Sequence, residues 1–112
     1  MKPLAIQRTA AFEEDFRLQA DWYVEKAGED IAERYLAAVA ETAHRLSLQP
    51  GLGRKRHFRS HQLHGLRSMA AEGAFHKHLL FYRVEEKALV LFRVLHGMRD
   101  LPRRLLDQPG AE

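Results

Sequence analysis

The residues best suited to chemistry are seven histidines and a set of arginines. One histidine group, His76 and His78, would share a face of a strand; the other comprises His57, His61 and His64. The chain has no cysteine, and no Asp or Glu accompanies either group at the spacing of metal ligands. We therefore expect half-exposed histidines on a basic surface, with no metal and no cofactor.

Nucleophilic catalysis would need a serine held beside a general base. Ser47, Ser60 and Ser68 are the serine candidates, but none follows a strand-to-helix elbow or an Asp–His couple. The glycines at 51 and 53 end a predicted helix and do not form a phosphate-binding loop. The sequence gives no support for chemistry on a small metabolite.

A metal-free ribonuclease needs only a base, an acid and cations around a phosphate. His96 and Arg99, at the end of the last predicted strand, could supply these together with Lys77 or Arg83. Alternatively, the arginines pair with carboxylates, and His96 and Asp100 only set up the final turn. We favour this second interpretation for His96 and Asp100, whereas binding and simple solvation stay open for the cations as a set.

Length and composition bound the class of protein. The 112 residues predict one domain over 1–112, and 46% hydrophobic with 29% charged residues is typical of a globular protein. No apolar run approaches the ~18 residues that span a bilayer, and no signal-peptide core follows Met1. The absence of cysteine excludes disulfides. We expect a cytoplasmic protein that does not enter a membrane.

The distribution of charge says more than the net charge of +3. Acidic residues concentrate before residue 30, whereas the segment 54–59 carries cations with no acid nearby. Further cations crowd the end of the chain: Arg93, Arg99, Arg103 and Arg104. A basic face favours a polyanion or an acidic peptide as partner.

Two amphipathic helices are predicted after a short strand at 4–7. Thr9 can cap the first helix, and Gly28 ends it. The helical spacing of apolar residues then continues from residue 32 to residue 46, and Pro50 ends the second helix. The joint is so short that the helices must fold back on each other as a hairpin.

The second half of the sequence predicts a sheet, with strands at 66–71, 75–84 and 88–96. The last two are joined by the short polar segment 85–87 and form an antiparallel hairpin. In the last strand both alternating sets are apolar (89, 91 and 95; 90, 92 and 94), which indicates an interior strand covered on both faces. Asp100 can cap a short closing helix, with Pro102 in its first turn and Leu105 and Leu106 folding back.

These elements define an α+β domain in the order β-α-α-β-β-β with a short C-terminal helix. The helical hairpin packs on one face of a small antiparallel sheet, and the other face stays partly open. We expect Phe16 and Leu36 to belong to the core between hairpin and sheet.

Residues 79–84, followed by 93–100, resemble the ParE branch of the ParE/RelE superfamily of bacterial toxins. The most specific piece is an apolar strand followed by Leu-His-Gly-x-Arg-Asp, at residues 95–100. Supporting pieces are Tyr23, Ala32 with Tyr35 and Leu36, the turn at 49–54, and the segment 63–67. They cover nearly the whole chain in order, and the resemblance implies the same fold that the periodicity predicts.

The resemblance implies a toxin of a type II toxin–antitoxin module, of the kind associated with plasmid stabilisation. RelE-type members cut messenger RNA on the ribosome, and ParE-type members inhibit DNA gyrase without a recognised catalytic centre. Of the RelE pattern only Arg99 is present, since Leu79 and Leu105 stand where an arginine and a tyrosine are expected. We therefore favour gyrase inhibition; the alternatives are an mRNA endonuclease and an inactive stabilisation module.

The resemblance also implies a cognate antitoxin, ParD-like, with a disordered tail that folds on the toxin. The residues expected to contact the target are Arg99, Arg103, Arg93 and His96. The residues expected to contact the antitoxin are Tyr23, Tyr35, Leu36, Val39 and Arg83. A ribonuclease would instead use Arg99, His96, Arg83 and Lys77.

Overall fold

A computed structural model describes residues 2–110. β1 (Ala5–Arg8) leads into α1 (Ala10–Ala27) and α2 (Glu29–Leu48). There follow β2 (Arg54–Lys55), β3 (Arg67–Ala70), β4 (His78–Glu85), β5 (Ala88–His96) and α3 (Arg103–Leu106), with 3-10 turns at 50–52, 61–63 and 73–75. The predicted α+β class and element order are confirmed, with the two-residue strand β2 as an addition. None of the described helices has the length and apolar character needed to cross a membrane.

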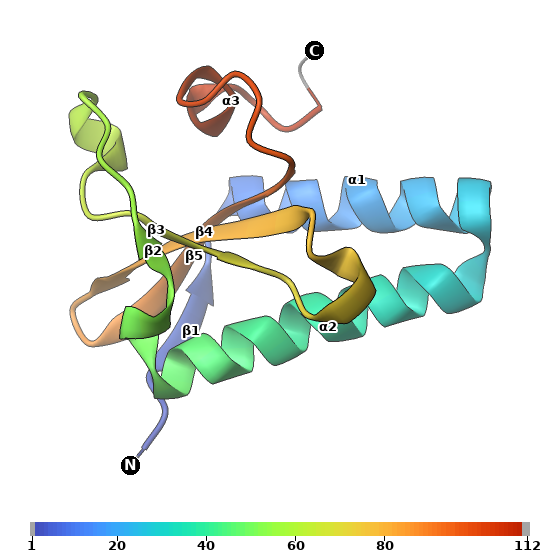
Figure 1. The fold of residues 1–112 in the computed structure, drawn as a ribbon, viewed down its shortest axis with the longest axis horizontal. Helices are drawn as coiled ribbons and strands as arrows, with labels where there is room; N and C mark the ends of the chain where they lie inside the picture. Colours follow the sequence, from blue (N-terminus) through green and yellow to red (C-terminus); the bar gives the residue numbers. More distant parts are fainter. Residues whose placement is uncertain (1, 111–112) are drawn as a thin grey trace.

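The helical hairpin forms where the sequence predicts it (Figure 1). The Thr9 hydroxyl accepts a hydrogen bond from the Phe12 N–H at 3.0 Å, which caps the start of α1. Gly28 ends the helix at a φ of 100°, a backbone conformation that side chains disfavour, and its N–H donates to the Tyr23 carbonyl. This single glycine therefore makes the tight reversal between α1 and α2.

The sheet has the order β1-β5-β4-β3-β2 and is mixed. The pairs β2–β3, β3–β4 and β4–β5 are antiparallel. β1 runs parallel to β5, with Ala5 opposite Ala88 and Arg8 opposite Leu91. The expectation of a purely antiparallel sheet is therefore wrong for the edge formed by β1. The predicted interior position of β5, between β1 and β4, is confirmed.

A β-bulge interrupts β5 at Phe92. Phe81 of β4 pairs with Arg93, while the next residue, Tyr82, pairs with Leu91, so that Phe92 is the extra residue. The Thr9 hydroxyl donates to the Phe92 carbonyl at 2.7 Å and holds the bulge against the start of α1. The bulge shifts the alternation of side chains by one residue, and the regular alternation predicted for this strand is wrong beyond it.

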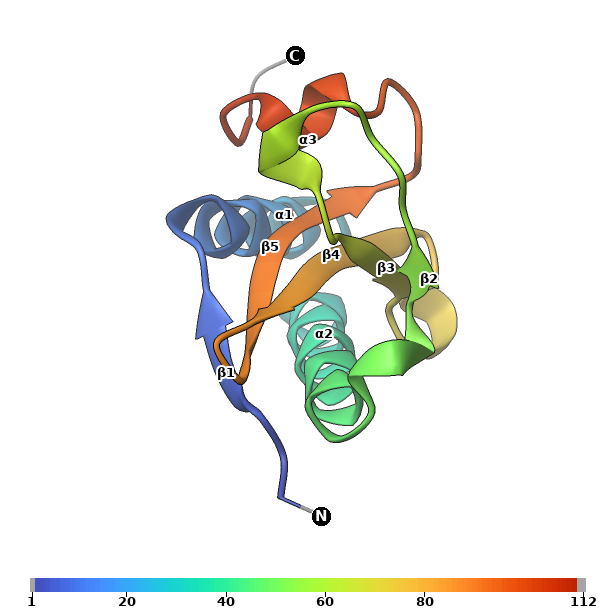
Figure 2. The ribbon, with the colours of Figure 1, turned by 90° about the vertical axis from the view of Figure 1, so that its left-hand side faces the viewer.

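Two apolar clusters cover the two faces of the sheet. The larger lies under the helical hairpin and comprises Phe12, Tyr35, Val39, Ala43, Leu46, Ala71, Leu80, Tyr82, Leu89, Leu91 and Val94. The smaller lies on the opposite face and comprises Leu63, Leu66, Phe81, Leu95 and Leu105. The turn at 61–63 and α3 lie together over that second face (Figure 2). The expectation of a partly open face is therefore wrong, because these short segments supply a second core.

Some predicted boundaries and contacts differ in detail. β4 begins at His78, because residues 73–75 form a 3-10 turn. The N-cap of α3 is Pro102, with no side-chain cap, whereas Asp100 contributes its backbone carbonyl to the Arg104 N–H. Leu105 is buried as predicted, but Leu106 is exposed, and so is Leu36 of α2.

A tyrosine fixes the turn that leads into β2. The Tyr82 hydroxyl accepts from the Gly53 N–H at 2.8 Å and donates to the Pro50 carbonyl at 2.6 Å. A Cβ atom at Gly53 would lie 2.3 Å from the Tyr82 oxygen, so only glycine fits. The turn and the start of β2 are thus anchored to the centre of the sheet.

Candidate functional site

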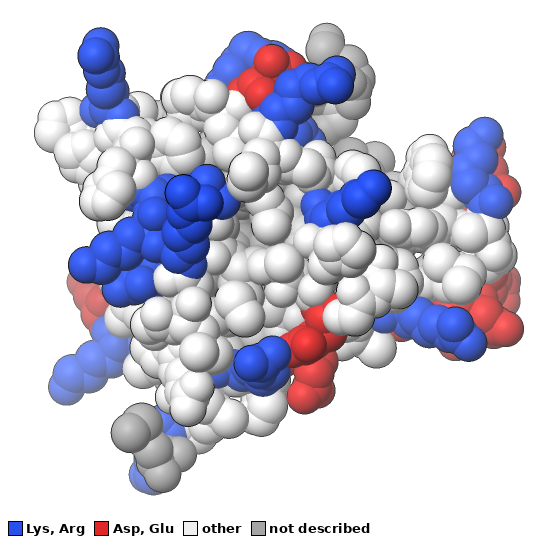
Figure 3. Space-filling model, viewed as in Figure 1, with Lys and Arg blue, Asp and Glu red and all other residues white. Residues whose placement is uncertain are grey.

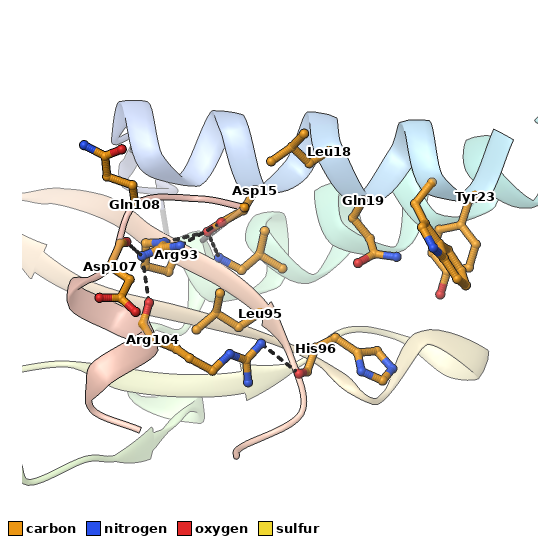
Figure 4. A pocket seen from close by; sticks show the side chains of 13 residues that line it. Asp15, Leu18, Gln19, Tyr23, Arg93, Leu95, His96, Arg104, Asp107 and Gln108 are labelled. Carbon is orange, nitrogen blue, oxygen red and sulfur yellow. Dashed lines mark hydrogen bonds and ion pairs between the residues drawn. The ribbon is translucent and has the colours of Figure 1, made fainter. Parts of the chain in front are cut away.

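A groove lies between α1 and the C-terminal segment. It has a volume of about 640 Å³ and is lined by residues of α1, β5 and the segment around α3. Figure 4 shows the side chains of Gln19 and Tyr23 reaching from α1 toward the part of β5 that carries Leu95 and His96. Trp22, the only tryptophan of the chain, also lines the groove and is 51% exposed.

A buried ion pair forms one end of the groove. Arg93 donates to the Asp15 carboxylate through Nε at 2.6 Å and through Nη2 at 2.8 Å, and both side chains are buried (Figure 4). The Val94 N–H donates to the same carboxylate at 3.2 Å. Burial raises the pKa of the Asp15 carboxyl above its ordinary value, and its contacts with Arg93 and Val94 act in the opposite direction.

The remaining nitrogen of Arg93 holds the C-terminal segment. Nη1 donates to the carbonyls of Arg104 at 2.9 Å, Leu105 at 3.2 Å and Asp107 at 2.6 Å. These carbonyls lie at the end of α3, where helical carbonyls lack partners within the helix. Arg93 is therefore a structural residue that joins α1, β5 and α3, and its burial does not fit the expected contact with a target.

The exposed cations at the end of β5 are the other expected target residues. His96 and Arg99 are exposed, and Arg99 has no carboxylate partner among residues 2–110. Arg103 is exposed and pairs with Asp100 at 3.2 Å and Asp107 at 2.7 Å. Of the arginines expected to contact the target, Arg99 is therefore the one without an ion pair among the described residues.

Aromatic rings surround His78 at the end of the hairpin core. Its Nε2 lies 2.8 Å from the Tyr23 hydroxyl, and its ring centroid lies 4.8 Å from that of Tyr35 and 4.9 Å from that of His96. Burial, with a smaller contribution from His96, lowers the pKa of His78 to about 4. The expectation of a half-exposed histidine is therefore wrong for His78, which packs as a neutral ring.

The residues expected to bind an antitoxin separate into two groups. Tyr35 and Val39 are buried in the hairpin core, and the Tyr35 hydroxyl is a buried group without a hydrogen-bond partner among the described residues. Burial also raises the pKa of the Tyr35 hydroxyl. Leu36 is exposed and Tyr23 half-buried, so these two remain accessible.

Arg83 is engaged elsewhere in the fold. Its guanidinium donates from Nη1 to the carbonyls of Gln62 and His64, both at 2.9 Å, and from Nε to Glu85 at 2.5 Å. It also lies over the Phe92 ring, 5.3 Å from the centroid. Arg83 therefore fixes the 61–63 turn on the sheet, and this structural role accounts for its contacts.

The four ribonuclease candidates do not converge. Lys77 and His96 lie near each other, because the Gly97 N–H donates to the Lys77 carbonyl at 2.8 Å and His78 pairs with His96. Arg83 lies five residues beyond His78 in β4, where it pairs with Val90. At the rise of a strand, five residues separate Arg83 from His78 by roughly 16 Å. Arg83 is therefore separated from Lys77 and His96, which lie at the end of the β4–β5 pair that leads to Arg99.

Sequence reasoning missed Asp15, Arg104 and Trp22. Arg104 donates from its side chain to the carbonyls of His96 and Arg99, both at 3.1 Å, and so shapes the turn that carries Arg99. One feature of the sequence could have indicated Asp15: it follows Phe12 by three residues, and this spacing places it on the buried side of α1. Nothing in the sequence connects it to Arg93, which is 78 residues away.

A helical hairpin on one face of a five-stranded mixed sheet, with a short helix on the other, is the fold of RelE/ParE-like toxins. The family model for the ParE toxin of the type II toxin–antitoxin system parDE matches residues 6–101. The chain therefore belongs to the ParE toxin family.

Solved structures share this fold. The chain is similar to one from the chromosomal ParDE toxin–antitoxin system of P. aeruginosa, with a TM-score of 0.69 and 19% identity, over 85% of this chain and 97% of that one. It is also similar to one from the toxin–antitoxin complex RelBE2 of Mycobacterium tuberculosis, with a TM-score of 0.59 and 26% identity, over 86% and 93%. No match was found among curated proteins.

Proposed function

We propose that this ParE-type toxin acts in the cytoplasm by inhibiting DNA gyrase, and that a ParD-like antitoxin neutralises it. One observation carries the choice of target: Leu79 and Leu105, which stand where the RelE-type pattern has an arginine and a tyrosine, pack in the second core and offer neither a charge nor a proton to an RNA phosphate. Acid–base catalysis needs groups within hydrogen-bond reach of one reacting centre. Inhibition by binding makes no such demand, and family membership supports the same choice.

The target is tested by inducing the toxin in cells that carry two reporters, one for DNA damage and one for transcript cleavage. We expect growth arrest with a gyrase-dependent damage response, and inhibition of supercoiling when the purified toxin is added to gyrase. A ladder of cleaved transcripts without DNA damage would establish the RelE-type activity instead. Normal growth at full expression of folded toxin would indicate an inactive module.

The groove beside α1 is the surface we assign to the antitoxin tail. Leu18, Trp22 and Leu95 supply apolar contacts, while Arg104 and His96 lie at its margins. An amphipathic helix with acidic residues along its border matches this arrangement, because apolar positions bury surface and the charges set the pairing. A tail that folds on binding spreads its contacts, so it also reaches the exposed Leu36 of α2.

Trp22 makes this assignment measurable, because it is the only tryptophan in the chain. If the tail covers the groove, antitoxin binding shifts the toxin's tryptophan emission to shorter wavelength. Leu18→Ala should weaken binding, whereas Val24→Ala, an aliphatic truncation one carbon smaller at an exposed site of the same helix outside the groove, should not. An unchanged emission together with equal affinities for both variants would show that the tail binds elsewhere. That result would leave the proposal of gyrase inhibition untouched, because the gyrase assay does not involve the antitoxin.

A further inference from the structure

The edge of the sheet at β2 carries a dense group of cations. Arg54, Lys55 and Arg56 lie on or next to β2, and Arg67 lies on β3 beside it. We call these four residues the basic edge. Figure 3 shows the largest accumulation of Lys and Arg atoms on this side of the molecule over β2 and β3, with no acidic atoms across its front.

The basic edge is not neutralised within the described part of the chain. Between Glu41 and Glu72 the sequence has no Asp or Glu. The cations that form ion pairs are Arg17, Arg45, Arg83, Arg93 and Arg103. None belongs to the basic edge. Arg54 and Lys55 are exposed, whereas Arg56 and Arg67 are half-buried, and Arg67 donates from Nη1 to the carbonyl of Gly53 at 2.8 Å.

The cations of the basic edge also repel one another. Lys55 pairs with Arg67 across the two strands, and like charges at such positions destabilise a sheet. Burial, and then the charge of Arg54, lower the pKa of Arg56. A bound anion would relieve this repulsion.

Arg56 is held in position rather than free. Its Nε donates to the Ser68 hydroxyl at 2.7 Å, its Nη2 lies 3.2 Å from the Met98 sulfur, and its guanidinium lies 5.9 Å from the centroid of the Phe81 ring. Its Nη1 has no acceptor among residues 2–110. A fixed guanidinium with a free donor is suited to a phosphate oxygen.

We propose that the basic edge binds the phosphate backbone of a double-stranded nucleic acid. Side chains of successive strand residues point to opposite faces, so Arg54 and Lys55 lie on opposite sides of the edge. Cations on both sides of the edge can reach phosphates on the two strands that border a groove.

Other partners fit the basic edge less well. Single strands are bound by stacking bases on exposed aromatic rings, whereas Phe81, which lies beside Arg56, is buried in the second core, and Phe58 packs against that core. A protein partner would need an apolar centre to bury, and the four residues are all cations. β2 has only two residues, which is too short an edge to template a long added strand. The proposal goes beyond gyrase inhibition and does not depend on it.

The test measures fluorescence anisotropy of labelled duplexes with the full chain, over about 50 to 200 mM NaCl. DNA and RNA duplexes of one sequence distinguish the two sources of a duplex backbone, and a single strand is the third probe. The edge variant is Arg54→Gln with Lys55→Gln, two exposed cations whose side chains form no hydrogen bond within residues 2–110. The matched control is Lys26→Gln with Arg34→Gln, which removes the same charge at the far end of the hairpin (Figure 1).

Duplex binding should fall steeply with salt. Loss of two phosphate contacts should lower the magnitude of the log–log salt slope by about 1.8 in the edge variant, and affinity at about 100 mM salt should fall by roughly tenfold or more. The control should keep the wild-type slope. Equal losses in both variants, tighter binding to the single strand, or no duplex binding at about 50 mM salt would overturn the proposal. Circular dichroism verifies that each variant is folded.

Discussion

The buried pair Asp15–Arg93 should be the most sensitive polar contact of the domain. Asp15→Asn removes the negative charge opposite a buried guanidinium and weakens two hydrogen bonds of 2.6 and 2.8 Å. Breaking a buried pair from one side typically costs about 3–5 kcal/mol, because the other charge stays buried without compensation. The carbonyls of the α3 segment still contact Nη1 of Arg93, which favours the lower part of this range, about 3 kcal/mol.

A loss of this size would be a large fraction of the total stability, since small domains unfold at a cost of about 5–15 kcal/mol. Urea unfolding followed by circular dichroism measures it directly, and Trp22 emission follows the groove at the same time. The control is Asp21→Asn, which breaks an exposed pair with Arg17 on the same helix and should cost less than about 0.5 kcal/mol. If Asp15→Asn and Asp21→Asn unfolded at the same urea concentration, the assigned role of the buried pair would be refuted.

Three further outcomes are expected. The free energy of unfolding should fall by on the order of 3 kcal/mol as the pH falls from about 6.5 to 4, because His78 is protonated in the unfolded chain but stays neutral when folded. Urea titrations at several pH values should find a smaller dependence of stability on pH in His78→Gln. By the same assay, Phe16→Ala should cost about 2–4 kcal/mol because Phe16 packs on the core, and Leu36→Ala less than about 1 kcal/mol because Leu36 is exposed. Equal losses in the two variants would contradict the faces assigned to these residues. Arg99→Ala should change stability by less than about 0.5 kcal/mol yet reduce growth arrest on induction, and a fully toxic, folded variant would exclude Arg99 from the target surface.

Local patterns were sufficient to predict the helices and the last two strands. Thr9 and Gly28 delimit α1 through their own backbone and side-chain chemistry, and the helical spacing of apolar residues is set within each helix. The hairpin of β4 and β5 is equally local, since only the two residues Glu86 and Lys87 separate the strands. Each of these features depends on neighbours in the chain, which a sequence displays directly.

The errors in sheet topology and packing involve partners that are distant in the chain. The direction of β1 depends on its pairing with β5, more than 80 residues away. The bulge at Phe92 depends on the Thr9 hydroxyl, and a shift of one residue exchanges the two faces of a strand. The second core depends on short segments, around Leu63 and Leu105, whose periodicity is too brief to predict an element.

Arg93 shows how such a shift changes the interpretation of a site. In a regular β5 it would lie on the same face as Leu91, but beyond the bulge it lies on the face of Leu95, under α3. From the sequence, an arginine in a basic C-terminal region is expected to be a surface cation, whereas Arg93 is the residue around which the C-terminal segment is organised.

Replacing both members of the buried ion pair tests this role directly, in the double variant Asp15→Leu with Arg93→Met. The double variant should be more stable than the sum of the single losses predicts, because no buried charge is left unpaired. It should also release the end of α3, since the acceptor carbonyls lose their donor, and proteolysis near Asp107 should then increase although the core remains folded. A C-terminal segment that stays protected in that variant would show that Leu105 alone holds it in place.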